Sequence, residues 1–324
     1  MAENLTLSLP GQKALSGESD ALFMKTFTGE VMTAFEERNV MKDLHRIRTI
    51  DHGKSASFAL LGKAAARYHT PGTAILGSNK IATEERTINI DDLLIADVAI
   101  YDLDDAKNHY DVRQEYSKQL GWALAREFDK KTMRVGLLAA RASGLIDDEP
   151  GGSVIKGGAT VETSISTDGE KLAEAMFSCA QIFDEKDIIE WERTLIVRPA
   201  QYYLLAQTTK VLNRDWGGMG VYADGSVLKV AGIQIIKSNN LPNSNVEKVT
   251  GEKNDYSGDF TNTVALCLQK EAIGTVKLKD LTVEKSGSDF HIMYQSTMMV
   301  GKYAMGHGIL RPGCAIEISK EAAA

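Results

Sequence analysis

The sequence predicts an α+β fold, and three features of the chain lead to this prediction. A proline-free stretch, 111–141, has the residue spacing of one long amphipathic helix. Segments that alternate as β-strands do lie on both sides of it, within 55–103 and 275–303. Residues 168–268 mix short helical and strand-like runs, as compact α/β lobes do. With 324 residues, the chain is long enough for two or three domains.

The predicted central helix has its apolar residues three or four positions apart, which places them on one helical face. Asp111 is positioned to cap its N-terminus together with Gln114, and Gly144 follows its C-terminus. At about 1.5 Å per residue the helix extends about 46 Å. Glycine within a helix costs about 1 kcal/mol relative to alanine, so we expect the helix to bend or pack closely at Gly121. The other residues of its expected packing face are Val112, Tyr116, Leu120, Leu124 and Phe128, followed by Val135 and Leu138.

Two segments precede the first strand-like region. Residues 1–19 are small and polar, and we expect them to form a mobile or partner-dependent arm. Residues 20–38 predict a helix because aromatic and branched apolar residues recur every fourth position. These residues are Phe23, Phe27, Val31 and Phe35.

The segment 55–103 predicts a long hairpin, with two extended runs around the turn-rich stretch 69–79. Its middle has few large apolar residues, and a two-stranded ribbon with so little core is marginally stable by itself. We therefore expect the hairpin to lie against other protein, either in this chain or in a neighbouring one. The charged residues expected at that contact are Lys63, Arg67, Lys80, Glu84, Glu85 and Arg86.

The remaining segments complete the predicted organisation. The Gly/Ser/Thr-rich stretch 147–167 predicts a linker. In the lobe after it we expect helices and strands, followed by strands in the C-terminal part, where Phe290, Ile292, Tyr294 and Ser296 alternate with polar residues. The expected helices are 168–183 and 199–209, and the expected strands are 194–197, 227–237, 264–268, 275–278 and 290–303.

Composition excludes several classes of protein. The net charge of -7 argues against a dedicated nucleic-acid-binding protein, since those are usually basic. The three cysteines lie far apart in the sequence and none belongs to a CxxC pair, so we expect neither a disulfide framework nor a zinc site. We also expect no signal peptide and no membrane-spanning segment.

The sequence contains no recognisable catalytic motif. Gly53, Lys54 and Ser55 resemble the end of a phosphate-binding loop, but Arg48 occupies the position of its first glycine. The six histidines have no metal-ligand spacing, and no GxSxG motif is present. We therefore expect no catalytic residues, no metal and no cofactor, and a structural protein rather than an enzyme.

Several stretches of the chain match one family in their residues, their order and their approximate spacing. They are Gly29–Phe35, Ser55–Lys63, Asp91–Gly121, Ala272–Glu284 and Lys302–Pro312. Together they resemble the major capsid proteins of short-tailed bacteriophages (podoviruses) of the T-seven group. They cover roughly half of the chain, whereas 146–265 resembles the family weakly.

The resemblance implies the HK-ninety-seven-like capsid fold shared by tailed phages and herpesviruses. In that fold the chain has an N-terminal arm, an extended loop, a peripheral domain with a spine helix, and an axial domain. The corresponding ranges are 1–54 for the arm, 55–103 for the loop, 104–167 and 269–324 for the peripheral domain with its spine helix 111–141, and 168–268 for the axial domain.

The resemblance also implies a function and partners. Copies of the chain would assemble into hexamers and pentamers of an icosahedral shell of triangulation number seven, the head of a virion. Assembly would occur in the bacterial host cytoplasm with a separate scaffolding protein and a portal at one vertex. The shell would enclose double-stranded DNA without sequence-specific binding, and no membrane would take part.

Two alternatives remain open at the level of the sequence. One is the shell protein of a cellular nanocompartment of the encapsulin type, which has the same fold. The other is an α/β enzyme with an unrecognised site in 168–268.

Overall fold

The computed structural model describes residues 21–75, 77, 81–101, 112–146, 149–157, 164–208 and 229–322. The chain divides into two compact units. The first unit comprises Met1–Asn39, Leu93–Phe128 and Lys279–Ala304, and the second comprises Val40–Asp92, Asp129–Leu278 and Met305–Ala324. The predicted arm 1–19, the predicted cap Asp111 and the hairpin residue Lys80 lie outside the described residues.

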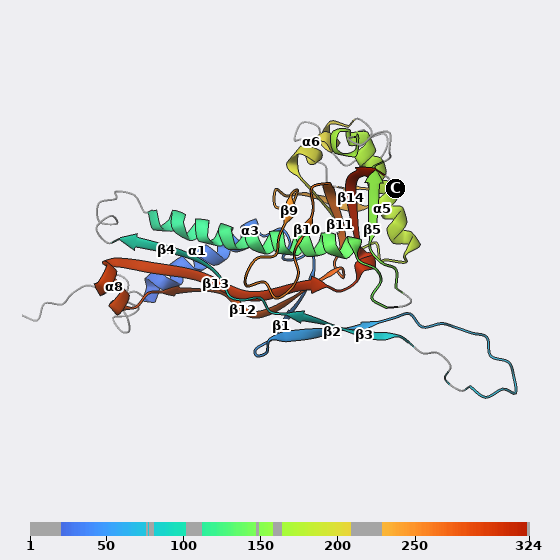
Figure 1. The fold of residues 1–324 in the computed structure, drawn as a ribbon, viewed down its shortest axis with the longest axis horizontal. Coiled ribbons are helices and arrows are strands. Elements are labelled where there is room, and N and C mark those ends of the chain that lie inside the picture. The colour runs from blue at the N-terminus through green and yellow to red at the C-terminus, as the bar shows by residue number, and fades with distance from the viewer. Residues whose placement is uncertain are drawn as a thin grey trace, which may run out of the picture. The chain divides into compact units, whose positions relative to one another are not determined.

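Both helices predicted for the N-terminal half are confirmed. They are α1 (Ala21–Arg38) and α3 (Val112–Arg141), the long helix in Figure 1. In the first unit the two helices share an apolar core with β13, in which the Phe35 ring lies edge-on to Phe128 and to Tyr303 at centroid distances of 6.1 and 6.2 Å. The other buried members are Phe27, Val31, Leu120 and Leu124. Tyr116, predicted for the same face, remains 38% exposed, as an amphipathic ring at the border of a packed face can.

Gly121 lies where α3 approaches the backbone of α1. A Cβ atom at this position would lie 2.6 Å from the carbonyl oxygen of Val31 and 2.9 Å from the Cβ atom of Ala34. Backbone atoms cannot move aside as a flexible side chain can, so only glycine fits this helix crossing.

The four-stranded sheet has the order β1-β12-β13-β4. Its strands are β1 (Arg46–Thr49), β12 (Ile273–Lys285), β13 (Ser296–Ile309) and β4 (Leu94–Tyr101). β4 pairs antiparallel with β13, from Tyr101 opposite Ser296 to Leu94 opposite Tyr303. The predicted hairpin range 55–103 is therefore too long, because its last strand belongs to this sheet and not to the hairpin.

The strand predicted for 290–294 is wrong. Residues Ser288–Tyr294 form the short helix α8, which ends at Gln295 in the left-handed conformation, and strand β13 begins only at Ser296. Phe290 and Tyr294 stack with ring centroids 4.7 Å apart, a contact that the four-residue spacing of a helix allows. Their spacing fits a helix as well as a strand, and Asp289 in the first turn favours the helix through its dipole.

The second unit contains a six-stranded sheet of order β5-β14-β11-β6-β8-β7. Its strands are β5 (Ser153–Gly157), β14 (Ala315–Ala322), β11 (Thr263–Gln269), β6 (Arg193–Val197), β8 (Ile233–Lys237) and β7 (Lys229–Val230). The prediction of a linker at 147–167 is wrong in its middle, because β5 pairs in parallel with β14. The remaining short elements are α4 (Ser164–Thr167), β9 (Asn245–Val246), β10 (Gly258–Asp259) and the 3-10 turn Pro312–Cys314.

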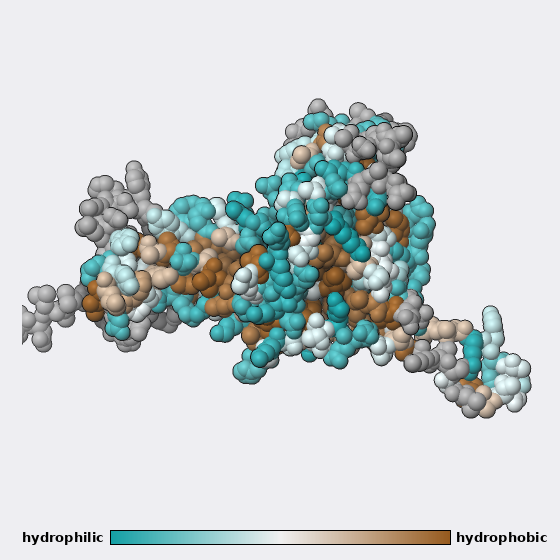
Figure 2. All heavy atoms as spheres, in the orientation of Figure 1, coloured by the Kyte–Doolittle hydropathy of each residue, from teal (hydrophilic) through white to brown (hydrophobic). Residues whose placement is uncertain are grey.

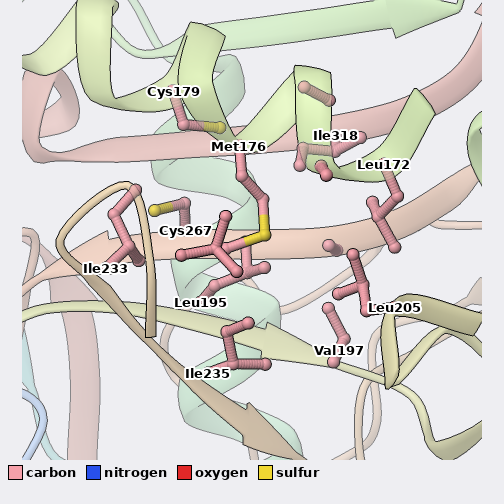
Figure 3. Packing of buried hydrophobic residues seen from close by; sticks show 14 of the residues in the cluster. Leu172, Met176, Cys179, Leu195, Val197, Leu205, Ile233, Ile235, Cys267 and Ile318 are labelled. Atoms are coloured by element: carbon pink, nitrogen blue, oxygen red, sulfur yellow. The ribbon is translucent and has the colours of Figure 1, made fainter. Parts of the chain in front are cut away.

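The predicted helices α5 (Gly169–Glu185) and α6 (Pro199–Gln207) are confirmed and pack on one face of this sheet. Asp168 caps α5 by accepting the backbone N–H of Glu170 at 2.9 Å. In Figure 3, Leu172, Met176 and Cys179 of α5 lie against side chains from β6, β8, β11 and β14. The labelled sheet residues are Leu195, Val197, Ile233, Ile235, Cys267 and Ile318.

The opposite face of β11 packs against α3. A Cβ atom at Gly136 would lie 2.9 Å from Leu266 and 3.2 Å from Leu268, whereas the intervening Cys267 points into the α5 core. Burial of both faces explains why the middle of β11, residues 264–268, is apolar at every position rather than alternating. Arg141, at the end of α3, forms a bidentate ion pair with the buried Glu317 of β14, with N···O distances of 2.6 and 2.7 Å.

A second buried carboxylate, Asp129 of α3, holds the segment that follows α1. It accepts the backbone N–H groups of Val40 and Met41 at 3.1 and 3.0 Å and the Asn240 side-chain amide at 3.2 Å. Burial raises its pKa from the ordinary 3.8 to about 6, although the backbone and amide hydrogen bonds act in the opposite direction.

We predict that Gly121→Ala lowers the free energy of unfolding by about 1–3 kcal/mol, because the added methyl overpacks the crossing of α1 and α3. Gly29→Ala is the matched control, since a Cβ atom there meets nothing within 4 Å. Alanine is the better helix former, so the control should be neutral or gain up to about 1 kcal/mol. Urea unfolding of both variants checks this, and equal stability of the two would contradict it.

The titration of Asp129 predicts a pH dependence of stability. The folded state binds this proton more tightly than the unfolded state, so the contribution of Asp129 to the free energy of unfolding falls as pH rises from about 4 to 6. The full effect is on the order of 3 kcal/mol. Asp129→Asn should remove this part of the slope in urea unfolding measured between pH 4 and 7. An unchanged slope in the variant would refute the assignment.

Candidate assembly interface

The hairpin consists of β2 (Ser55–Leu61) and β3 (Thr83–Asn89), paired antiparallel from Ser55 opposite Asn89 to Leu61 opposite Thr83. Next to the strands, the N–H of Gly62 donates to the carbonyl of Ala82 at 2.8 Å. Every residue from 63 to 75 is exposed. Figure 1 shows the extended loop beyond β2 and β3, and Figure 2 shows hydrophobic and hydrophilic residues mixed along it.

Large apolar side chains lie exposed along this hairpin. Tyr68 is fully exposed, Ile75 is 73% exposed, and Leu61 and Ile81 also have much of their surface in water. Scattered exposed apolar residues are ordinary on a compact surface. Here they lie on or beside a segment that has no core of its own, which makes them candidates for contact with another chain.

The charged residues predicted for this contact are not gathered into one cluster. Lys63 pairs with Asp187 of its own chain at 2.9 Å, and both side chains are largely exposed, so the pair contributes little to stability. Arg67 lies on the exposed loop. Glu84, Glu85 and Arg86 are exposed along β3.

Among the described residues of the hairpin, those at its root lie in an apolar core. Ala56 and Leu60 of β2 and Ile88 of β3 are buried in one cluster with Val276 and Leu310. The cluster packs the base of the hairpin, near Ala56 and Ile88, against the rest of the second unit. The exposed residues 63–75 are not members of this cluster.

A buried polar cluster, here called the Asp91 clamp, fixes the same root and consists of Asp91, Lys131, Glu252, Asn254 and Tyr256. The Asp91 carboxylate accepts the Tyr256 hydroxyl at 2.6 Å and the Lys253 backbone N–H at 2.9 Å. Lys131 of α3 lies 3.6 Å from the carboxylates of both Asp91 and Glu252. The Asn254 amide donates to the Asn89 carbonyl at 2.7 Å, so the clamp reaches the last residue of β3.

Electrostatics keep the Tyr256 phenol of the clamp protonated. Burial, and then the negative charge of Asp91, raise the pKa of the Tyr256 phenol well above its ordinary range. The phenol therefore remains a donor to Asp91, and it also accepts the backbone N–H of His307 at 3.0 Å. A buried carboxylate with this many directed donors holds its segment in one orientation.

The buried histidines of the second unit also serve packing. Burial lowers the pKa of His45 to about 4 and moves that of His307 in the same direction, so both rings are neutral at pH 7. His45 Nδ1 lies 2.6 Å from the Met41 carbonyl oxygen, and His307 Nδ1 lies 2.8 Å from the Thr275 hydroxyl. Within the described ranges, no three His, Cys, Asp or Glu side chains come together as a metal site. None of the helices described there is long and apolar enough to cross a membrane.

Comparison with known proteins assigns this architecture. A model of the Gp10A-like family, described as major capsid protein, matches residues 57–319. The chain belongs to this family. It is 32% identical over 326 residues to the major capsid protein of Escherichia phage T7, covering 93% of this chain and 92% of that protein. A chain of the capsid structure of cyanophage P-SCSP1u matches with a TM-score of 0.81 and 46% identity over 99% of both chains.

Family membership confirms the predicted HK-ninety-seven-like fold and the structural, non-enzymatic role as a phage major capsid protein. The alternative of an α/β enzyme is therefore wrong. The virus-like particle of Pyrococcus furiosus matches at a TM-score of 0.57 with 13% identity, which is a likeness of fold alone. The comparisons thus favour the phage capsid over a cellular nanocompartment.

The Asp91 clamp was not predicted as a site from the sequence. Asp91 was noted only within the stretch that resembles the family, and its partners Asn254 and Tyr256 lie more than 160 residues away. No local spacing signals such a contact.

We predict that Asp91→Asn lowers the free energy of unfolding by about 2–3 kcal/mol, because hydrogen bonds to a buried charge are lost and one acceptor becomes a donor. Asp92→Asn is the matched control. Asp92 forms an exposed pair with Lys253 at 3.2 Å, which is worth about 1 kcal/mol or less. Urea unfolding and hydrogen exchange at Asn89 and Ile90 measure the two effects, and equal effects would rule out the clamp.

Proposed function

We propose that this chain builds the icosahedral head shell of a short-tailed bacteriophage around double-stranded DNA. Copies would form hexamers and pentamers on a lattice of triangulation number seven, with a separate scaffolding protein and a portal at one vertex, in the bacterial host cytoplasm. The observation that carries the proposal is the hairpin, a ribbon with a fixed root and an exposed loop in a member of a capsid-protein family.

In this proposal the hairpin lies on a neighbouring subunit. Tyr68 and Ile75 supply apolar area that the free subunit leaves in water. The charges of the hairpin set its register, because exposed ion pairs add more to specificity than to affinity. The residues proposed for this role are Lys63, Arg67, Lys80, Glu84, Glu85 and Arg86.

The other parts take the places that the family pattern gives them. Residues 168–268 would form the axial domain, and α3 would be the spine of the peripheral domain, with Val112, Tyr116, Leu120, Gly121, Leu124 and Phe128 on its packing face. Each subunit would make several modest heterologous contacts that symmetry closes into a shell. Such contacts can be individually weak because each subunit makes many of them at once.

The charge of the chain suits a container for DNA. With a net charge of -7, the wall would not hold the phosphate backbone through counterion release, as basic proteins do. Packaging and release of DNA would then meet no strong attraction at the wall. Electron microscopy of the chain expressed with and without the scaffolding protein from the same genome tests the proposal, and scaffold-dependent closed shells are the expected result.

We predict that trypsin cuts unassembled subunits early after Lys63, Arg67, Lys80 or Arg86 and spares these sites in intact shells. Exposed loops are preferred sites of cleavage, and a neighbour would cover them after assembly. Mass spectrometry of timed digests identifies the sites. Equal cleavage in both states would mean that no neighbour covers the hairpin.

Deletion of Pro71–Asn79 provides a second test of the same contact. The root keeps its apolar cluster and the Asp91 clamp, so the deleted subunit should unfold at the same temperature as the intact subunit. It should nevertheless form no stable shells in sedimentation. Normal shells from the deletion variant would exclude an assembly role for the loop.

A further inference from the structure

A second exposed element in the second unit is the loop of residues 187–192 between α5 and β6, here called the Trp191 loop. Trp191 is 79% exposed and Ile189 is 66% exposed. We propose that the Trp191 loop is a preformed contact site for a second copy of this chain, with Trp191 as its anchor. The proposal adds a contact to the assembly function proposed above and rests on it.

The backbone of the loop is held in an uncommon conformation. Asp187 and Glu192, one at each end, have positive φ values of 56° and 63°. Residues other than glycine adopt this left-handed region rarely, and they remain there only where the surroundings enforce it. Two such residues in six positions indicate a loop that is built to a fixed shape.

Arg193 enforces that shape from beneath. Its side chain is buried and donates hydrogen bonds to the carbonyl oxygens of Ile188 and Ile189, and to the Asp184 carboxylate at 2.8 Å. The guanidinium lies over the Phe183 ring at 5.2 Å. The buried Arg193 side chain holds the carbonyls of the loop in place. It therefore keeps the loop rigid while the apolar side chains of the loop remain exposed.

The ends of the loop are tied down as well. Asp187 pairs with Lys63 at 2.9 Å, and Glu192 pairs with Lys270 at 3.3 Å. The backbone N–H of Ile188 donates to the Phe183 carbonyl at 3.0 Å. The loop therefore loses little conformational freedom when a partner binds, which is the general advantage of a preorganised site.

Trp191 has the character of an interface anchor. Tryptophan is enriched among the residues that dominate binding energy, because a large ring fills a pocket and loses few rotatable bonds. A side chain of this size gains nothing from being held in water on a rigid support. In this proposal, a second copy of the chain buries the ring.

The charge of the loop indicates what kind of partner fits. Asp187, Glu190 and Glu192 flank the two apolar residues, so the loop would repel the phosphate backbone of a nucleic acid. A protein surface with apolar and basic groups is complementary to it. In a shell made of this chain, the surface present beside every copy is another copy, so the partner proposed for the loop is a second copy.

A tryptophan fluorescence experiment tests the proposal directly. The chain has three tryptophans, at 122, 191 and 216, so Trp122→Phe with Trp216→Phe leaves Trp191 as the only one. Acrylamide should quench Trp191 efficiently in unassembled subunits. In shells, quenching should fall several-fold and the emission should shift to the blue, as expected for a ring moved from water into a contact. If the double variant does not fold, the difference between the wild type and Trp191→Phe gives the same signal.

A matched pair of variants gives the energetic test. Trp191→Ser should raise the subunit concentration required for assembly by about 30-fold or more, the effect of losing a hot-spot residue. Its melting temperature as a subunit should not change, since the ring makes few contacts there. Phe177→Ser removes a similarly exposed ring from α5, outside the loop, and should change assembly far less.

The possible results separate this proposal from the proposed function. Shells in which Trp191 remains open to acrylamide would overturn the loop contact alone. Equal effects of the two serine variants would also overturn it. If the wild type forms no shells under any condition, both proposals fall.

Discussion

The buried carboxylate of Asp91 joins segments that lie far apart in the sequence, and the root of the hairpin depends on it. Apolar packing at the root holds Ala56, Leu60 and Ile88 in place, but burial of apolar area has no preferred direction. The hydrogen bonds from Tyr256, Lys253 and Asn254 do have direction. Apolar packing thus supplies attachment, and the directed hydrogen bonds of the clamp fix the root of the hairpin.

The Trp191 loop uses the same physical arrangement at a smaller scale. The buried guanidinium of Arg193 supports the Trp191 loop. In the same way, the buried carboxylate of Asp91 supports the root of the hairpin. A buried ionised group is costly unless its partners are all in place. That cost penalises every alternative conformation of the exposed element above it. Buried charge in this chain therefore gives shape to the parts that leave apolar side chains in water.

The sequence predicts those elements whose pattern is local. Helices α3 and α5 follow from a 3.6-residue period, and both are found where they were expected. The failures have two causes. At β5, pairing with a distant strand decides the structure, and at α8 one residue spacing fits two local structures. Glycines flank β5, so the sequence predicts a linker there. The strand that pairs with it, β14, is about 160 residues away. Phe290 and Tyr294 satisfy a strand period and a helix period equally.

The candidate site divides in the same way. Scarcity of core residues in the hairpin is a property of one segment, and residues 63–75 between β2 and β3 are exposed. The expected contact with another chain stays a prediction. The Asp91 clamp draws on β3, α3 and the 252–256 segment, and no spacing rule connects these. The Trp191 loop cannot be predicted from the sequence for another reason. Asp187 and Glu192 have left-handed φ values, and glycine, the residue that usually marks this conformation in a sequence, is absent from the loop.

Charge and apolar exposure act on assembly over different distances. Two copies that each carry a net charge of -7 repel one another beyond contact, within a screening length of about 8 Å at physiological salt. Burial of Tyr68, Ile75 or Trp191 gains free energy only at contact, and only where the shapes match. Repulsion between two copies therefore disfavours encounters in which these apolar side chains are not buried. The buried groups that support the hairpin root and the Trp191 loop favour one geometry of contact between copies. A shell protein needs this combination, because a subunit with adhesive surfaces and no repulsion would aggregate before it closed a lattice.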